Sequence, residues 1–394
     1  MKKIIEIQSI TKKTTNLVVA TIIIDNTIET ITTEISDNMT EYILTDRCDA
    51  FVIGLLHLAI SGGYSFKSDI PISEELYYNL VHHFIDALHD ETKGMYKPEF
   101  DIPLISTYQK KGKIVATGIS CGIDSLYTVA THSIEIPPSF KLTHLAFFDI
   151  GSHGNQDNQH SQNLAEGRYN ICASFAKEYG YTFIYVRSDL YKILEKRGGY
   201  SHISNHTYMT GFCVLLLQSG INKYYYSAGH PYQDFRCRKV SVDEDFDASF
   251  YDLLTSQTIS VNGMHFYSSG GAVSRIQKTK LLSHYPPAFR YLNVCVNNVH
   301  NDGTCFKCMR TLLGIDAVGN LDNFATVFDI NAYKKNKKHY LQKMYIYGQW
   351  RGDMLLAEII PFFRKELTFA FKLNALLKYL ADNVKRICSK FFGK

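Results

Sequence analysis

The sequence contains no long apolar run. Across its 394 residues, no stretch approaches the ~20 consecutive apolar residues that a membrane-spanning helix needs. The first residues, Met1 to Lys3, lead directly into a strand-like segment and not into an apolar signal core. These absences argue against an integral membrane protein and against a secretory leader, and we expect a cytoplasmic protein.

Positive charge is in small excess, and the nine cysteines follow no regular spacing. A net charge of +4 is too small to indicate nucleic acid as a partner. Irregular cysteines in a chain without a leader argue against a disulfide scaffold. A single Trp accompanies 27 Tyr and 24 Phe, a composition that suits aromatic-lined pockets as well as an aromatic core.

Three regions differ in pattern, and we expect three structural units. Residues 1–105 combine β-branched, strand-like segments with two helical stretches, which predicts a small N-terminal α+β unit. Residues 106–325 alternate strands with helices. Residues 326–394 predict a basic, helical C-terminal tail. The two helical stretches of the first region are 48–60 and 72–88.

The alternation in the middle region predicts an α/β fold with a parallel sheet and helices on both faces. The expected strands are 114–119, 142–150, 181–186, 223–227 and 291–296. The expected helices are 161–179 and 207–218. Because parallel α/β sheets bind ligands at the carboxyl ends of their strands, residues that follow these strands are the candidates for a site.

A run of small residues follows the first of these strands and precedes a helical pattern. It reads Ser120, Cys121, Gly122, Ile123, Asp124 and Ser125. A helix N-terminus offers unpaired N–H groups to an anion, Gly122 allows close approach, and the serine hydroxyls can donate to phosphate oxygens. Asp124 suits a helix cap, a Mg²⁺ ligand or a holder of the turn. An ordinary strand-to-helix turn is the alternative.

This run resembles the pyrophosphate loop of the PP-loop ATP pyrophosphatases, Ser-Gly-Gly-x-Asp-Ser, with Cys121 in place of the first glycine. It lacks the Gly-Lys-Ser/Thr ending of a Walker loop. The resemblance implies a sheet of the HUP/PP-loop type that binds ATP with Mg²⁺ on residues 120–125 and splits it into AMP and pyrophosphate. In this class of fold adenosine lies after the second strand, where Asp149 and His153 stand. A lone acid and a lone histidine are also ordinary loop residues.

Three cysteines late in the middle region suggest a metal site. Cys305 and Cys308 form a C-x-x-C pair, and Cys295 lies ten residues before it. Thiolates at this spacing suit tetrahedral Zn²⁺, with Asp302 or His300 as the fourth ligand. Unrelated buried thiols are the alternative.

The segment around these cysteines extends the resemblance, which covers about residues 112–324. It is similar to the late cysteine cluster of 7-cyano-7-deazaguanine synthases and of UDP-N-acetylmuramoyl-peptide glutamate epimerases. Asp302 stands where that cluster has its next cysteine, which favours Asp302 as the fourth ligand. A similar segment of the epimerase-like group has a Gly pair followed by Arg and Lys, here Arg275 and Lys278. These two cations lie on one helix face and can hold a pyrophosphate or a carboxylate, or they form a solvated basic face.

Other polar residues are weaker candidates. His202, Asn205 and His206 precede an apolar helix and suit either its cap or a substrate contact. His230 follows the fourth strand and suits a general base or a structural loop histidine. The acidic residues Asp243, Glu244, Asp245 and Asp247 suit a lid, a Mg²⁺ contact or a solvated loop.

The tail mixes cations with large apolar residues. A basic run at 334–338 precedes helical patterns at 354–363 and 367–380, and the last ten residues combine Lys and Arg with Ile and Phe. Such a mixture can bind an anionic membrane surface peripherally, or it can pack on the rest of the protein. A homodimer is compatible with the sequence.

These observations together predict an AMP-forming adenylating enzyme with Asp124, Arg275 and Lys278 in the reaction. The expected substrate is a carboxylate or amide on a sugar- or peptide-linked metabolite, as in epimerisation or amidation of cell-envelope precursors. A deazaguanine-synthase-like enzyme that modifies a heterocycle or a protein terminus is the first alternative. A module that senses ATP or AMP without turnover is the second. The zinc would be structural.

Overall fold

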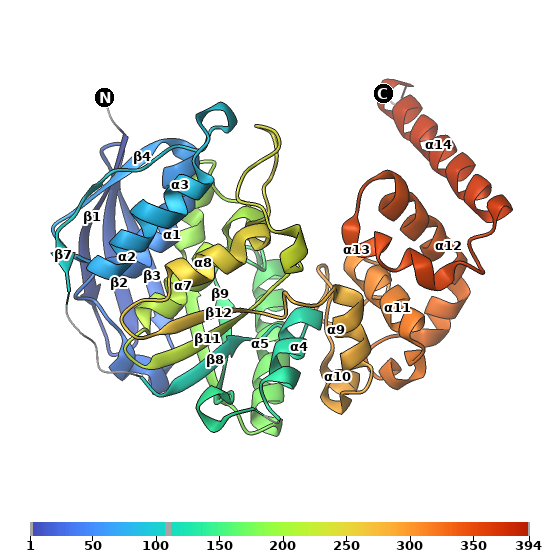
Figure 1. Ribbon diagram of the computed structural model, residues 1–394, viewed down its shortest axis with the longest axis horizontal. Helices are drawn as coiled ribbons and strands as arrows, with labels where there is room; N and C mark the ends of the chain where they lie inside the picture. The colour runs from blue at the N-terminus through green and yellow to red at the C-terminus, as the bar shows by residue number, and fades with distance from the viewer. Residues whose placement is uncertain (1–2, 107–111, 135, 393–394) are drawn as a thin grey trace. The chain divides into compact units, whose positions relative to one another are not determined.

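The computed structural model describes residues 3–106, 112–134 and 136–392 (Figure 1). The chain divides into two compact units. Unit 1 comprises Met1–Ser120 and Thr128–Ala272, and unit 2 comprises Cys121–Tyr127 and Val273–Lys394. The boundaries between the units therefore cross the chain three times within the region that the sequence groups as 106–325, and each unit contains part of the expected phosphate loop.

Unit 1 is built on one ten-stranded, mostly parallel sheet. The strand order is β12-β11-β8-β9-β10-β3-β2-β1-β4-β6, and β5 pairs with β7 separately. The strands are β1 Lys3–Lys12, β2 Leu17–Ile24, β3 Thr27–Ile35, β4 Tyr64–Ser68, β5 Ile72–Ser73, β6 Phe100–Asp101, β7 Leu104–Ile105, β8 Ile114–Gly118, β9 His144–Asp149, β10 Thr182–Ser188, β11 Ile221–Ser227 and β12 His265–Ser269. The chain steps outward from β8 through β9 and β10 and then returns to β11 on the other side of β8. That reversal is the position at which α/β sheets open a ligand crevice.

The strands of the expected N-terminal unit belong to this same sheet. β1, β2 and β3 pair antiparallel, and β3 continues the sheet by pairing antiparallel with β10, with Ile35 opposite Val186. Buried side chains alternate along β2, as expected for a strand with one face in the core. The backbone edge of β3 is thus paired with the parallel part of the sheet.

Helices cover both faces of the sheet. The helices α1 (Asp49–Gly62) and α7 (His202–Leu216) pack against each other on one face (Figure 1). Both are buried nearly all round, and Phe51 of α1 meets Phe212 of α7 edge to face at 5.3 Å. The helix α5 (Gln159–Glu178) packs on β9 and β10 from the other face. Because α1 and α7 carry apolar side chains nearly all round, they can be buried on the sheet side and on the opposite side.

Unit 2 is mainly helical. Its helices α9, α11, α12 and α14 pack in succession around buried residues of α11 and α12. The remaining helices are α2 Glu74–Asn79, α3 Ile85–Leu88, α4 Ile123–Thr131, α6 Leu190–Lys196, α8 Asp252–Thr258, α9 Arg275–Leu282, α10 Pro286–Tyr291, α11 Phe306–Val318, α12 Ile330–Tyr345, α13 Met354–Ala357 and α14 Phe369–Phe392. Within the described part of the chain, no helix combines the length and apolarity that crossing a membrane requires.

Several expected elements differ in the structure. The strand expected at 291–296 is wrong, because α10 begins with two prolines and ends at Tyr291, and the side chain of Asn301 accepts the N–H groups of Val294 and Cys295. The stretch 72–88 starts as the short strand β5 and only then turns helical. The sequence analysis also missed β12 and α12.

Candidate functional site

The loop after β8 leads from the sheet of unit 1 into unit 2. Ile119 still donates its N–H to Ala146 of β9, and Ser120 is exposed at the carboxyl end of β8. Helix α4 starts at Ile123, three residues earlier than the sequence pattern indicates. The expected order of strand, short loop and helix is therefore present.

Cys121 adopts a backbone conformation that glycine accepts more readily than other residues. Its φ is +56°, in the left-handed region, and its side chain is fully buried. Its carbonyl accepts the N–H of Asn293 at 2.8 Å within unit 2. A non-glycine residue in this region costs about 1–2 kcal/mol, so the loop keeps the glycine-like turn in spite of the cysteine side chain.

The first turn of α4 is internally bonded. The hydroxyl of Ser125 donates to the carbonyl of Gly122 at 3.2 Å, and Leu126 donates its N–H to the same carbonyl at 3.0 Å. Ile123 is buried. The turn is thus held in a fixed shape by its own backbone and by Ser125.

Asp124 joins this loop to two cations from the following part of unit 2. Its Oδ2 accepts a hydrogen bond from Nη2 of Arg275 at 2.6 Å, and its Oδ1 accepts one from Nζ of Lys278 at 3.0 Å. Lys278 is 2% exposed. Both cations belong to the first turns of α9, whose start is fixed by a capping box between Ser274 and Gln277. The structure therefore brings together the three residues that the sequence analysis expects in the reaction.

The charges around Asp124 keep it ionised. Burial by itself would raise the pKa of Asp124, but the charges of Arg275 and Lys278, with the hydrogen bond from Lys278, hold it below its usual value. Two cations therefore face one carboxylate at the start of α9.

Arg310 is a further cation at this place that the sequence analysis did not assign. It lies on α11, and burial and then the charge of Arg275 lower its pKa to about 10, so it stays protonated at neutral pH. Together with Arg275 and Glu358 it lines a cavity of about 10 Å³, which holds about one water molecule. Its position directly after the C-x-x-C pair, in Cys308-Met309-Arg310, was the signal available in the sequence.

The expected metal ligands lie together in unit 2. The Sγ atoms of Cys295, Cys305 and Cys308 and a carboxylate oxygen of Asp302 all lie within 4.8 Å of one another. Four ligands around zinc at ~2.3 Å would lie about 3.8 Å apart, so a small contraction closes the site. This group can hold a metal ion such as zinc, and Asp302, not His300, is its fourth member.

The cluster is supported by the backbone around it. Asp302 Oδ1 accepts the N–H groups of Thr304 and Cys305 at 2.8 and 2.9 Å. Burial favours its protonated form, yet these N–H groups lower the pKa of Asp302 to about 2. Burial and the adjacent Cys305 thiol raise the pKa of Cys308, and a bound cation would reverse that shift. The eight cysteines whose side chains the structure describes are all free.

A separate cavity in unit 1 contains Asp149 and His153. It has a volume of about 480 Å³ and lies between α5 and the carboxyl ends of β9 and β10. Asp149 is 4% exposed, its Oδ1 lies 3.5 Å from Nδ1 of His153, and its Oδ2 lies 3.6 Å from Nε of Arg187. Aromatic rings complete the wall, contributed by Phe147, Tyr169 and Tyr185. A flat ring with N–H donors would find both stacking surfaces and an acceptor here.

A scan against protein-family models found no match, and searches of curated proteins and of solved structures found none either.

Proposed function

We propose that the protein is an ATP-dependent adenylating enzyme of the PP-loop type that forms AMP and pyrophosphate. The observation that carries the proposal is the meeting of Arg275 and Lys278 with Asp124 of the Ser-x-Gly-x-Asp-Ser loop. The partners are separated by 151 and 154 residues in the chain, so their meeting is a product of the fold. A phosphate-type loop with two cations held beside it has the parts of a triphosphate clamp.

The proposed reaction uses these parts in one displacement. A carboxylate oxygen of the substrate attacks the α-phosphorus of ATP, which enters with Mg²⁺. The bond from the α-phosphorus to the bridging oxygen breaks, and pyrophosphate leaves with the electron pair. Arg275 and Lys278 stabilise the charge that accumulates on the leaving pyrophosphate, and Asp124 fixes their positions. Arg310 adds positive charge to the same place.

The metal cluster has a structural role in this proposal. Zinc on Cys295, Asp302, Cys305 and Cys308 would join the N-terminus of α11 to the segment that follows α10. Because Arg310 is two residues after Cys308, the same metal would also fix the position of Arg310.

The substrate in the leading form of the proposal is a carboxylate on a sugar- or peptide-linked metabolite. The cavity at Asp149 gives a specific reason to keep a heterocyclic substrate as the second candidate. Its stacked and perpendicular rings accept a planar group, and Asp149 accepts N–H donors. That planar group is a purine-like substrate.

The test is a pyrophosphate-release and hydroxamate assay on the full chain. Mg·ATP and hydroxylamine are incubated with a panel of peptide- and sugar-linked carboxylates and of carboxylated deazapurines. We expect AMP, pyrophosphate and a hydroxamate from at least one compound, which identifies the substrate class. ADP and orthophosphate as products would exclude the proposal.

Variants of helix α9 distinguish a specific role of Arg275 and Lys278 from the effect of removing any positive charge from this helix. Arg275→Gln and Lys278→Gln should each abolish AMP formation, whereas Lys280→Gln, on the same helix and exposed, should not change it. If ATP binds and is recovered intact with every compound, the nucleotide-sensing alternative is correct.

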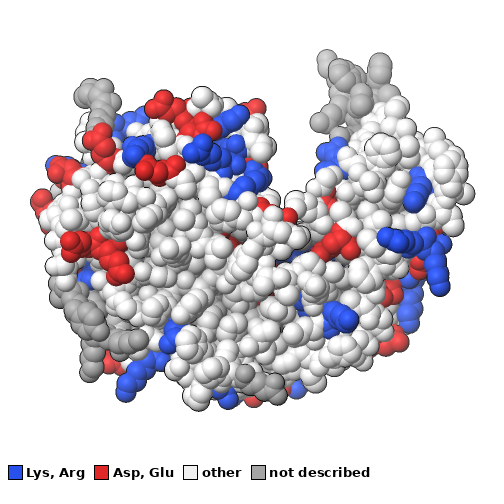
Figure 2. Space-filling model, in the orientation of Figure 1, with Lys and Arg blue, Asp and Glu red and all other residues white. Residues whose placement is uncertain are grey.

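Nucleic acid is not the proposed partner. On the face shown in Figure 2, Lys and Arg side chains are mixed with Asp and Glu. If the protein bound transfer RNA with an affinity that falls steeply as salt rises, nucleic acid would again be a candidate partner.

A further inference from the structure

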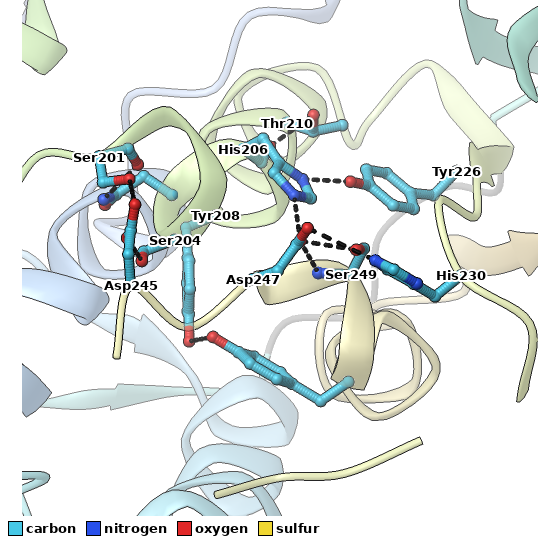
Figure 3. A network of polar contacts seen from close by, with 12 residues as sticks. Ser201, Ser204, His206, Tyr208, Thr210, Tyr226, His230, Asp245, Asp247 and Ser249 are labelled. Carbon is cyan, nitrogen blue, oxygen red and sulfur yellow. Dashed lines mark hydrogen bonds and ion pairs between the residues drawn. The ribbon is translucent and has the colours of Figure 1, made fainter. Parts of the chain in front are cut away.

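A polar network in unit 1 centres on Asp247, between β11 and α8 (Figure 3). Asp247 caps the short helical turn Ala248–Tyr251, and its Oδ1 accepts the backbone N–H and the hydroxyl of Ser249 at 2.9 and 2.6 Å. Two imidazoles face the same carboxylate. His206 Nε2 lies 3.1 Å from Oδ1, and His230 Nε2 lies 3.6 Å from Oδ2.

The contacts of His206 fix the positions of its protons. A carboxylate only accepts hydrogen bonds, so Nε2 of His206 carries the proton that Asp247 receives. Its Nδ1 lies 2.5 Å from the hydroxyl of Tyr226. In the neutral imidazole this nitrogen is an acceptor, so Tyr226 donates its phenolic proton to His206. Asp247, His206 and Tyr226 thus form a directed chain of carboxylate, imidazole and phenol.

The chain ends at the edge of the sheet where ligands bind. Tyr226 is the second-last residue of β11, and its ring stacks on Phe266 of β12. Asp247, His206 and Tyr226, here called the relay, have partly exposed side chains, as does His230. The Nδ1 of His230 is buried and has no hydrogen-bond partner in the described part of the protein. Nδ1 of His230 can therefore make one more hydrogen bond within this network.

The loop that carries Asp247 has a second attachment to α7. The neighbouring Asp245 is held on α7 by the hydroxyls of Ser201 and Ser204 at 2.8 and 2.7 Å. That pair of bonds already fastens the segment before Asp247 to the start of α7. The His206–Tyr226 contact is an additional feature, and it points away from the loop toward β11 (Figure 3).

We propose that Tyr226, His206 and Asp247 form a proton-accepting site at the carboxyl end of β11. A substrate proton moves to the phenolic oxygen of Tyr226 while the phenolic proton moves to Nδ1 of His206. The imidazolium that results is held by the carboxylate of Asp247, and no further reactant is needed. Residues far apart in sequence and on separate elements supply the three groups.

The chemistry of a phenol selects the class of substrate. Proton transfer is most efficient between groups of similar acidity. A phenol and a primary ammonium group both have pKa values of about 10, whereas an alcohol is a much weaker acid. The carboxylates of Asp245 and Asp247 also favour a cation. The site thus suits a primary amine that must lose a proton before it acts as a nucleophile.

The test is labelling of the full chain with aryl sulfonyl fluorides at neutral pH, followed by peptide mapping. The phenolic oxygen attacks sulfur, the sulfur–fluorine bond breaks, fluoride leaves, and the proton remains on His206. Tyr226 should react about tenfold or more faster than Tyr267 of the neighbouring strand, because general base assistance contributes at least that much. Tyr267 is 37% exposed and Tyr226 is less exposed, so access cannot explain faster reaction of Tyr226.

Variants and two reagents decide the assignment. The rate advantage of Tyr226 should disappear in Asp247→Asn and His206→Gln and should persist in His202→Gln, an exposed histidine on the same helix. It should be larger with aminoethylbenzenesulfonyl fluoride, which carries an ammonium group, than with benzenesulfonyl fluoride. Equal labelling of Tyr226 and Tyr267, or an unchanged advantage in Asp247→Asn, overturns the relay. If the rate advantage of Tyr226 is equal or larger with the neutral reagent, the assignment of a primary amine as substrate is wrong.

A nitrogen NMR spectrum of the wild-type protein tests the same geometry without mutation. The neutral form of the His206 imidazole should carry its proton on Nε2 and not on Nδ1. A proton on Nδ1 instead would contradict the relay. None of these measurements uses ATP, so the relay and the adenylation proposal are tested separately.

Discussion

Lys278 and Asp124 form an ion pair across 154 residues of sequence, in which the lysine is buried and the Asp124 side chain is 21% exposed. The Nζ of Lys278 lies 3.0 Å from Oδ1 of Asp124, and Lys278 is 2% exposed. A buried ammonium group without an anion is costly, so this contact contributes to stability as well as to the proposed clamp.

Asp124→Asn should therefore destabilise the protein. We expect the free energy of unfolding to fall by about 3 kcal/mol, since removal of one partner leaves a buried charge uncompensated. The double variant Asp124→Asn with Lys278→Met should recover part of that loss. Urea denaturation measures both, with Lys280→Gln as the control. A loss no greater than that of the control would show that the pair does not stabilise unit 2.

The same carboxylate should shape the acid side of the stability profile. The folded-state pKa of Asp124 is lowered, so its contribution is present above the usual Asp value of about 3.9 and is lost as pH falls through the lower folded value. Asp124→Asn should thus flatten the decrease in stability below about pH 4. Urea midpoints over that range test it. Parallel profiles of the two proteins would contradict the prediction.

The cysteine cluster should bind about one zinc per chain. Cys305→Ser should abolish binding, whereas Cys237→Ser, a free and half-buried cysteine that does not belong to the cluster, should leave it intact. Asp302→Cys should strengthen binding, because a thiolate is a better zinc ligand than a carboxylate. Metal analysis and competition with a chelator measure these effects. If Cys305→Ser kept its full zinc content, the cysteine cluster would not be the zinc site.

Cys121 allows a direct measurement of backbone strain in the loop. Cys121→Gly and Cys121→Ala both remove the buried thiol, but only glycine accepts a φ of +56° without penalty. We expect the glycine variant to be more stable than the alanine variant by about 1 kcal/mol. Thermal unfolding compares the pair. An alanine variant of equal or greater stability would show that the turn relaxes.

The last helix presents an apolar stripe that an anionic membrane could bind. Leu373, Leu377, Leu380 and Val384 recur at helical spacing on α14 and are 46–58% exposed. We expect the full chain to float with vesicles that contain phosphatidylserine and Leu377→Glu to weaken this binding. Equal flotation with neutral vesicles would show that the basic residues take no part.

The relation between sequence and structure differs from element to element. The alternation between 114 and 227 correctly predicts β8, β9, α5, β10, α7 and β11, because β-branched buried strands and long helical patterns are local signals. It does not reveal that β3 joins β10, since pairing between edges depends on tertiary packing. The two prolines before Tyr291 were the local evidence against a strand there, and α12 was obscured by its run of lysines.

The candidate sites divide in the same way. Spacing in the chain is sufficient to indicate the loop at 120–125 and the C-x-x-C pair, since ligands from one short segment are held together by that segment. The resemblance already favoured Asp302 over His300, and the structure places Asp302 with the three cysteines. The ion pairs of Asp124 and the hydrogen-bond chain from Asp247 through His206 to Tyr226 were decided only by the tertiary structure. Hydrogen bonds and ion pairs act over about 3 Å, and only the folded chain brings residues so distant in sequence within that range.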